Sequence, residues 1–205
     1  MQAMLLSMLR GKVGRDLYVE SGRVYLRPPR NADCQAWADL RKDSRAFLTP
    51  WEPTWPADSL TRFAFKRRLE QYRYEWEQQS GYSLFIFNTA NDELVGGINL
   101  TNVRRGVALT GSLGYWVGGP HARQGFMTQA LAAMMDFAFG QLGLHRLEAA
   151  CLRNNVASQG LLRKSGFQQI GCARQYLRIN GQWQDHLLFE ILASDRRDTA
   201  AASKR

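Results

Sequence analysis

Residues 114–131 read GYWVGGPHARQGFMTQAL, which predicts a buried strand, a basic loop and then a helix. The strand ends at the Gly-Gly-Pro bend of residues 118–120. Beyond it, apolar residues recur at the three- and four-residue spacing of one helix face: Phe126, Ala130, Met134, Phe137 and Ala138. The N–H groups of a helix's first turn have no partner within the helix and lie at the positive end of its dipole. The stretch therefore predicts a phosphate site, although a glycine between a strand and a helix also serves ordinary packing.

Two residues of the loop strengthen the prediction of an anion site. Gly125 has no Cβ, so the backbone there can approach a ligand closely. Arg123 adds a long cationic side chain that can pair with a phosphate.

A second block, residues 154–167, reads NNVASQGLLRKSGF. An asparagine at its start and Gly166 at its end are typical of a short helix with an N-terminal cap and a glycine stop. Asn155 is therefore a candidate helix cap.

With both blocks in this order and spacing, residues 23–192 resemble the GNAT superfamily of acyl-CoA-dependent N-acyltransferases. Three shorter strings further resemble the bacterial ribosomal-protein-alanine N-acetyltransferases of the RimJ type: FLTPWEP at 47–53, NVRRG at 102–106 and NGQWQDH at 180–186. The resemblance implies an α/β fold with a mixed, mostly antiparallel sheet and a parallel β-α-β cofactor cleft. It also implies acetyl-CoA as cosubstrate, no metal, and transfer of acetyl to the N-terminal alanine, or another small residue, of a ribosomal protein.

The resemblance assigns cofactor contacts residue by residue. A backbone N–H near Trp116–Val117 would polarise the thioester carbonyl, and the loop would hold the pyrophosphate. The family loop usually reads Q/R-x-x-G-x-G/A, whereas residues 122–127 read ARQGFM, without the first polar and the last small residue. Backbone amides can still bind phosphates, so the loop remains a candidate site. The cofactor-binding residues that the resemblance implies are Trp116, Val117, Arg123, Gln124, Gly125, Phe126, Met127, Thr128 and Asn155.

The sequence offers no strong catalytic base. Many superfamily members carry a catalytic Glu at the position of Gly111, and some carry a Tyr that acts as general acid at the position of Leu162. A peptide α-amine titrates near 7.7–8.0, so roughly a third is neutral at pH 7.5, against about one lysine in a thousand. An α-amine therefore needs little help, and a peptide N-terminus is the expected acceptor.

Ser158 is the remaining polar candidate for protonating the leaving thiolate, because related enzymes of the RimL type carry a serine at this position. The alternative is that Ser158 only completes the first turn of its helix.

For the base we weigh Glu52 against Asp185, with water alone as a third possibility. The resemblance places Trp51 and Glu52 at the acceptor mouth, in a loop stiffened by flanking prolines, and Asp185 on a strand beside the same mouth. Either acid can also be an ordinary surface carboxylate. His121 and His186, the histidines near this site, are interpreted as structural.

The whole chain of 205 residues, 45% hydrophobic, predicts one globular domain over residues 21–193. It is expected to carry an N-terminal extension (1–20) and a basic disordered tail (194–205). Met1, Met4 and Met8 are alternative starts, and the first nine residues lack the basic segment and cleavage site of a signal peptide. Three distant cysteines without metal-ligand spacing are typical of reduced thiols in the cytoplasm.

Composition leaves three functions in competition. The net charge of +9 fits attraction to the phosphates of coenzyme A, affinity for ribosomes, or a solvated surface. Basic residues are interrupted by core residues, so no specific nucleic-acid face is predicted, and no apolar run is long enough for a membrane span. Besides the ribosomal-protein acetyltransferase, we keep an acetyltransferase of small-molecule amines and a low-turnover module that binds acetyl-CoA or ribosomes.

Alternation and helical spacing predict the remaining elements. Strands are expected at 22–27, 82–87, 94–103, 108–117 and 145–152, with a closing hairpin of 167–179 and 183–192 across Asn180-Gly181. Helices are expected from Asn31 or Asp33 to Arg41, from Asp58 or Ser59 to about Gln79, and from the 114–131 stretch to about Leu142. Residues 47–56 are expected to form an ordered loop.

Overall fold

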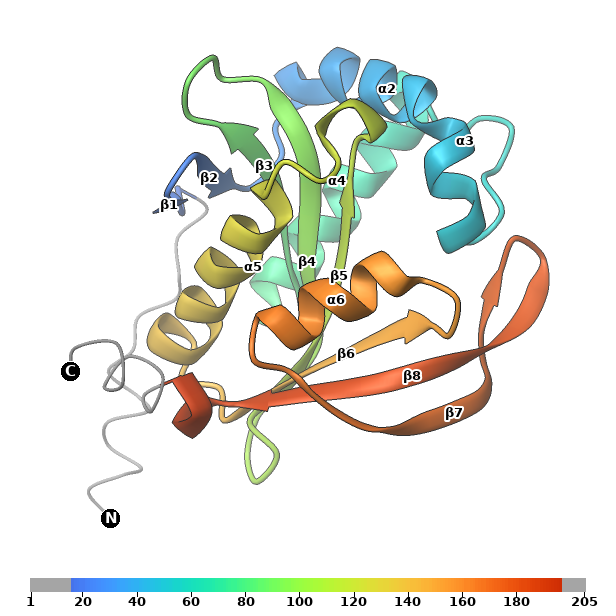
Figure 1. The fold of residues 1–205 in the computed structure, drawn as a ribbon. Helices are drawn as coiled ribbons and strands as arrows, with labels where there is room; N and C mark the ends of the chain where they lie inside the picture. The colour runs from blue at the N-terminus through green and yellow to red at the C-terminus, as the bar shows by residue number, and fades with distance from the viewer. Residues whose placement is uncertain (1–15, 197–205) are drawn as a thin grey trace.

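The computed structural model describes residues 16–196, which form an eight-stranded sheet in the order β1-β2-β3-β4-β5-β6-β8-β7 (Figure 1). Neighbouring strands are antiparallel except β5 and β6, which are parallel. The predicted fold class, α/β with a mostly antiparallel sheet and one parallel crossover, is confirmed. The strands are β1 (Val19–Ser21), β2 (Val24–Arg27), β3 (Tyr82–Asn88), β4 (Leu94–Arg104), β5 (Thr110–Val117), β6 (Arg146–Leu152), β7 (Gln168–Ile179) and β8 (Gln182–Leu192).

The helices pack on both faces of this sheet. They are α2 (Cys34–Asp43), α3 (Arg45–Leu48), α4 (Arg62–Glu77), α5 (Phe126–Asp136) and α6 (Val156–Lys164), joined by short 3-10 turns (Asn31–Asp33, Thr49–Trp51 and Gly119–His121) and a π-helical turn (Phe137–Gln141) that extends α5. Two predictions need correction. Helix α4 begins later than expected, because the Thr61 hydroxyl caps it by accepting from the Ala64 N–H at 3.2 Å. Residues 47–51 are helical, since Pro50 fits the first turn of a 3-10 helix.

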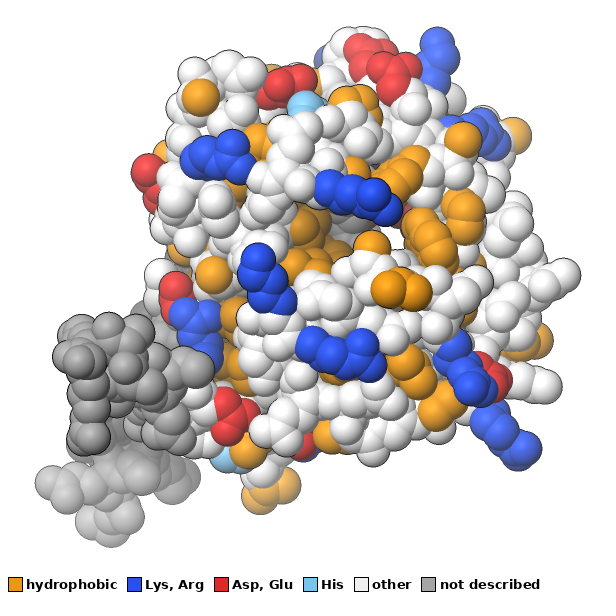
Figure 2. Space-filling model, viewed as in Figure 1, with side chains coloured by type: hydrophobic (Ala, Val, Ile, Leu, Met, Phe, Trp, Pro, Cys, Tyr) orange, Lys and Arg blue, Asp and Glu red, His pale blue; other side chains and the backbone are white. Residues whose placement is uncertain are grey.

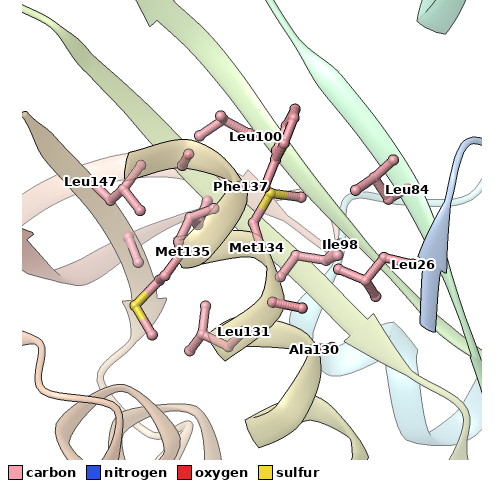
Figure 3. Close-up of a cluster of buried hydrophobic side chains, with 14 of the residues drawn as sticks. Leu26, Leu84, Ile98, Leu100, Ala130, Leu131, Met134, Met135, Phe137 and Leu147 are labelled. Carbon is pink, nitrogen blue, oxygen red and sulfur yellow. The ribbon is translucent and has the colours of Figure 1, made fainter. Parts of the chain in front are cut away.

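The larger core lies between the sheet and α5 (Figure 3). Inward-facing strand residues such as Leu84, Ile98 and Leu100 meet the apolar face of α5, which Leu131 and Met134 supply, and all five are fully buried. On the opposite face, Trp37, Phe65, Phe85, Phe87 and Leu94 form a second, smaller core beneath α2 and α4. With both faces covered, the central strands are apolar on both sides, and α5 is held rigidly at the sheet.

The two parallel strands separate part-way along their length. Strand β5 pairs with β6 only over Thr110–Leu113, although β5 continues to Val117 and β6 to Leu152. Beyond Leu113 the side of β5 that faced β6 therefore lacks a strand partner, and the two strands diverge in Figure 1. A Cβ at Gly114 would have no atom within 4 Å, so the backbone is open there. Beyond Leu113 the two strand backbones are therefore no longer paired, and we call the region between them the cleft.

The predicted domain boundaries lie close to the ends of the sheet. Strand β1 begins at Val19, two residues before the expected start at 21, and a helical turn follows β8 at 193–196. Most of the expected extension and tail lies outside the described residues.

Candidate active site

The loop between β5 and α5 is fixed at both ends by hydrogen bonds. The Gly118 N–H donates to the Val95 carbonyl at 2.9 Å, and the Gly119 N–H donates to the Ser44 hydroxyl at 2.8 Å. The Gln124 side chain closes the turn by donating to the Pro120 carbonyl at 2.7 Å. The basic loop predicted from the sequence is therefore an ordered turn at one end of the cleft.

The loop backbone leads into the N-terminus of α5 through two residues with positive φ. Arg123 and Gly125 both have left-handed backbone conformations, with φ of +60° and +84°. The N-cap of this helix is Gly125, which has no side chain to cap it. Because the first-turn N–H groups of 126–128 have no partner within the helix, they are available to an anion. This geometry supports the predicted phosphate site.

Arg23 is a cationic residue at this loop that the sequence reasoning missed. Its guanidinium donates to the Gln124 carbonyl and lies 4.9 Å from the centre of the Phe126 ring. Its backbone N–H donates to the Gln129 side chain at 2.7 Å, which fixes the β1–β2 turn against α5. Arg23 therefore adds a second positive charge beside Arg123. On the face that carries α5 and α6, Lys and Arg side chains are spaced around a hollow with a hydrophobic floor (Figure 2).

Helix α6 lies at the other side of the cleft. The Asn155 side-chain oxygen accepts from the Ser158 N–H at 3.0 Å, so the Asn155 side chain itself caps α6. Of the two roles considered for Asn155, the structure shows the helix cap, and the cap uses the side-chain oxygen. The Ser158 hydroxyl lies 2.8 Å from the Tyr115 hydroxyl of β5. Ser158 is thus placed at the point where β5 separates from β6.

Glu52 is held in an ion pair rather than standing free. Its two carboxylate oxygens accept from the Arg41 guanidinium at 3.2 and 2.5 Å, and one also accepts from the Trp55 indole at 2.7 Å. The Arg41 guanidinium lies over the rings of Trp55 and Trp116, with centres at 4.3 and 4.9 Å. This cluster ties the Trp51–Glu52 turn to α2 and to the end of β5.

The β7–β8 hairpin closes onto the Glu52 loop. The Asn180 N–H at the hairpin tip donates to the Glu52 carbonyl at 3.0 Å, so the two predicted walls of the acceptor mouth are joined there. Asp185 accepts from the Gln175 N–H at 3.0 Å and lies 3.8 Å from the Arg153 guanidinium. Because side chains alternate along a strand, Asp185 shares the α6 face of β8 with the buried Phe189. Glu52 contacts the opposite, α2 face.

A cavity of about 610 Å³ lies between the end of α4 and the β7–β8 hairpin. Tyr74, Glu75, Ser112, Glu148 and Tyr176 are among the residues that line it. Ser112 shares a face of β5 with Gly114 and Trp116, because alternate residues face the same way. The cavity is therefore on the sheet face opposite α5. Glu148 of β6 pairs in register with Ser112 of β5. A carboxylate is therefore next to β5, which has no acidic residue of its own.

The two histidines have structural contacts. His186 is buried, and its Nδ1 lies 3.0 Å from the Gln184 carbonyl. His121 lies 3.6 Å from Glu93. Within residues 16–196 no group of His, Cys, Asp and Glu side chains is arranged to hold a metal ion. Over the same range, no helix is both long and apolar enough to cross a membrane.

The Glu52–Arg41 pair predicts a clear stability effect. Their side chains are only 19% and 11% exposed, so Glu52→Ala leaves a largely buried guanidinium without its carboxylate. We expect the free energy of unfolding, measured in urea, to fall by about 2 kcal/mol, somewhat below the cost for a fully buried pair.

Asp58→Ala is the matched control, because it breaks the Asp58–Arg67 pair, whose side chains are 47% and 57% exposed. It should cost less than about 1 kcal/mol. Equal losses in the two variants would contradict a structural role for Glu52.

Comparison with known proteins gives consistent matches. A family model described as an acetyltransferase (GNAT) domain matches residues 23–168. The ribosomal protein uS5-alanine N-acetyltransferase of Escherichia coli is 33% identical, covering 80% of this chain and 85% of that protein. The probable N-acetyltransferase YjcK of Bacillus subtilis is 32% identical over 92% of this chain and 98% of its own length. Among solved structures, Mycobacterium smegmatis RimJ in complex with CoA-disulfide superposes with a TM-score of 0.84 at 30% identity, covering 91% of this chain and 95% of that one.

Proposed function

Because the chain belongs to the GNAT acetyltransferase family, we propose that it acetylates the α-amine of a protein N-terminus, with the N-terminal alanine, or another small residue, of a ribosomal protein as acceptor. The observation that carries this proposal is the 33% identity to an enzyme named for uS5 alanine, across 85% of that enzyme's length. The substrate class also suggests a cytoplasmic enzyme that meets its acceptor at or near the ribosome.

The cofactor side of the reaction follows from the loop and the cleft. The N–H groups of 126–128, with Arg123 and Arg23 beside them, are proposed to bind the pyrophosphate of acetyl-CoA. The thioester then lies in the opening between β5 and β6, where a backbone N–H near Trp116–Val117 donates to the carbonyl oxygen. A preorganised donor of this kind contributes about 3 kcal/mol to lowering the barrier.

The acceptor is proposed to approach from the opposite face, through the cavity that Ser112 lines. Glu75 in its wall is suited to attract a cationic N-terminus, whereas Glu148 is already paired with Arg146 at 2.9 Å. Glu52 is the better placed of the two proposed carboxylates, because it lies on the α2 face, whereas Asp185 lies on the α6 face. Since Glu52 is already paired with Arg41, we propose that it acts through water and that the low pKa of the α-amine does most of the work.

The test is acetyl-CoA turnover, followed by thiol release, against a panel of acceptors. Peptides that begin with Ala or Ser should have the highest kcat/KM, at least about tenfold above free lysine side chains, since a far larger fraction of an α-amine is neutral at pH 7.5. Faster turnover of aminoglycosides or other small amines would replace this proposal with a small-molecule acetyltransferase. No turnover, together with salt-sensitive co-sedimentation with ribosomes, would favour a binding module.

A further inference from the structure

One side-chain contact crosses the cleft and has no part in the sequence predictions. The hydroxyls of Tyr115, on β5, and Ser158, on α6, lie 2.8 Å apart although the residues are 43 positions apart in the chain. Tyr115 pairs with Ile98 of β4 but has no partner on β6. Its hydroxyl therefore reaches α6 across the gap that opens beyond Leu113.

Either hydroxyl of this pair can be the donor, and both are protonated at physiological pH. Burial raises the pKa of Tyr115 well above its ordinary value, so its phenol keeps its proton at physiological pH. Burial also raises the pKa of the Cys151 thiol on β6. A serine hydroxyl has one hydrogen to donate and two lone pairs that accept. If Tyr115 donates to Ser158, the Ser158 hydrogen is free to point elsewhere, and accepting a bond makes it a stronger donor.

We propose that Tyr115 is a positioning residue that turns the Ser158 hydrogen toward the sulfur leaving acetyl-CoA. In the reaction the acetyl–nitrogen bond forms, the acetyl–sulfur bond breaks, the amine loses a proton to water, and the thiolate gains one from water. Ser158 donates a hydrogen bond to the sulfur while its negative charge develops, and Tyr115 keeps its proton throughout. The inference rests on the proposed acetyl-CoA chemistry and on Ser158, and it is independent of which amine accepts.

The first test is Tyr115→Phe, which keeps the packed ring and removes only the hydroxyl. We expect kcat to fall about tenfold, the loss typical of one well-placed hydrogen bond, with the KM for acetyl-CoA unchanged. Tyr25→Phe is the matched control, because the Tyr25 hydroxyl also donates a hydrogen bond, to Asp92 at 3.1 Å, but lies on β2. It should leave kcat within about twofold of the wild type, since it touches no group of the cleft.

Two further measurements separate positioning from mere packing. In a Ser158→Ala background, Tyr115→Phe should have no additional effect, because the group that it orients is gone. With the acetyl selenoester of coenzyme A, whose leaving group needs less stabilisation, the Tyr115→Phe defect should shrink toward the wild-type rate. An undiminished defect in either case would overturn the proposal. The assays use whichever amine turns over fastest, so failure of the peptide proposal in the acceptor panel would not affect them.

Discussion

Gly125→Glu is expected to weaken acetyl-CoA binding severely, raising the Kd by about 100-fold or more. Gly125 precedes the first turn of α5, where the N–H groups of 126–128 are proposed to hold the pyrophosphate. A carboxylate there puts negative charge against the phosphates and offers the N–H groups an internal acceptor. Loss of about 3 kcal/mol of binding free energy corresponds to this change in Kd. Isothermal titration calorimetry on the folded variant measures it directly.

Gly125→Ala separates this effect from backbone strain. A Cβ at this position meets only the Arg23 guanidinium, at 3.8 Å, so there is space for it. The φ of +84° nevertheless costs any non-glycine residue about 1–2 kcal/mol of stability, and both variants carry that cost. The alanine variant should therefore lose stability but bind acetyl-CoA far more tightly than the glutamate variant. Equal affinities in the two variants would contradict the assignment of the loop to the phosphates.

Ser158→Ala is expected to lower kcat by about 100-fold, the effect typical of losing one preorganised hydrogen-bond donor to a developing negative charge, without changing the affinity for acetyl-CoA. The hydroxyl lies at the opening between β5 and β6, where the thiolate is proposed to form. The fold should tolerate the change, because the Asn155 cap bonds the backbone N–H of residue 158, which alanine retains. Single-turnover kinetics at saturating acetyl-CoA measures the chemical step.

Ser165→Ala is the control for this prediction. It removes a hydroxyl that follows the last turn of the same helix, away from the cleft, and whose oxygen has no hydrogen-bond partner among the described residues. It should leave kcat within about twofold of the wild type. Similar losses in both variants would show that Ser158 only stabilises α6. Water alone would then stabilise the leaving thiolate.

The order and type of the main elements could be predicted from the sequence because their signals are local. The Asn180-Gly181 turn set the β7–β8 hairpin, and Asn155 and Gly166 marked the ends of α6, each through residues only a few positions apart. The loop that ends at Gly125 likewise predicted where α5 begins, because the backbone conformation of a glycine is a local property. The resemblance of two blocks then indicated the acetyl-CoA chemistry.

What the sequence alone determined is therefore the succession of strands and helices and the loop that begins α5. The tertiary structure decided which side chains meet at the cleft. Arg23 lies 101 residues from Gln124, and Tyr115 lies 43 residues from Ser158, so no local spacing could pair them. Glu52 is only 11 residues from Arg41, yet their pairing depends on rings from Trp55 and Trp116 that hold the guanidinium. Local preferences fix how each segment folds, whereas contacts between segments exist only once the sheet and its two cores have brought distant residues within a few ångströms.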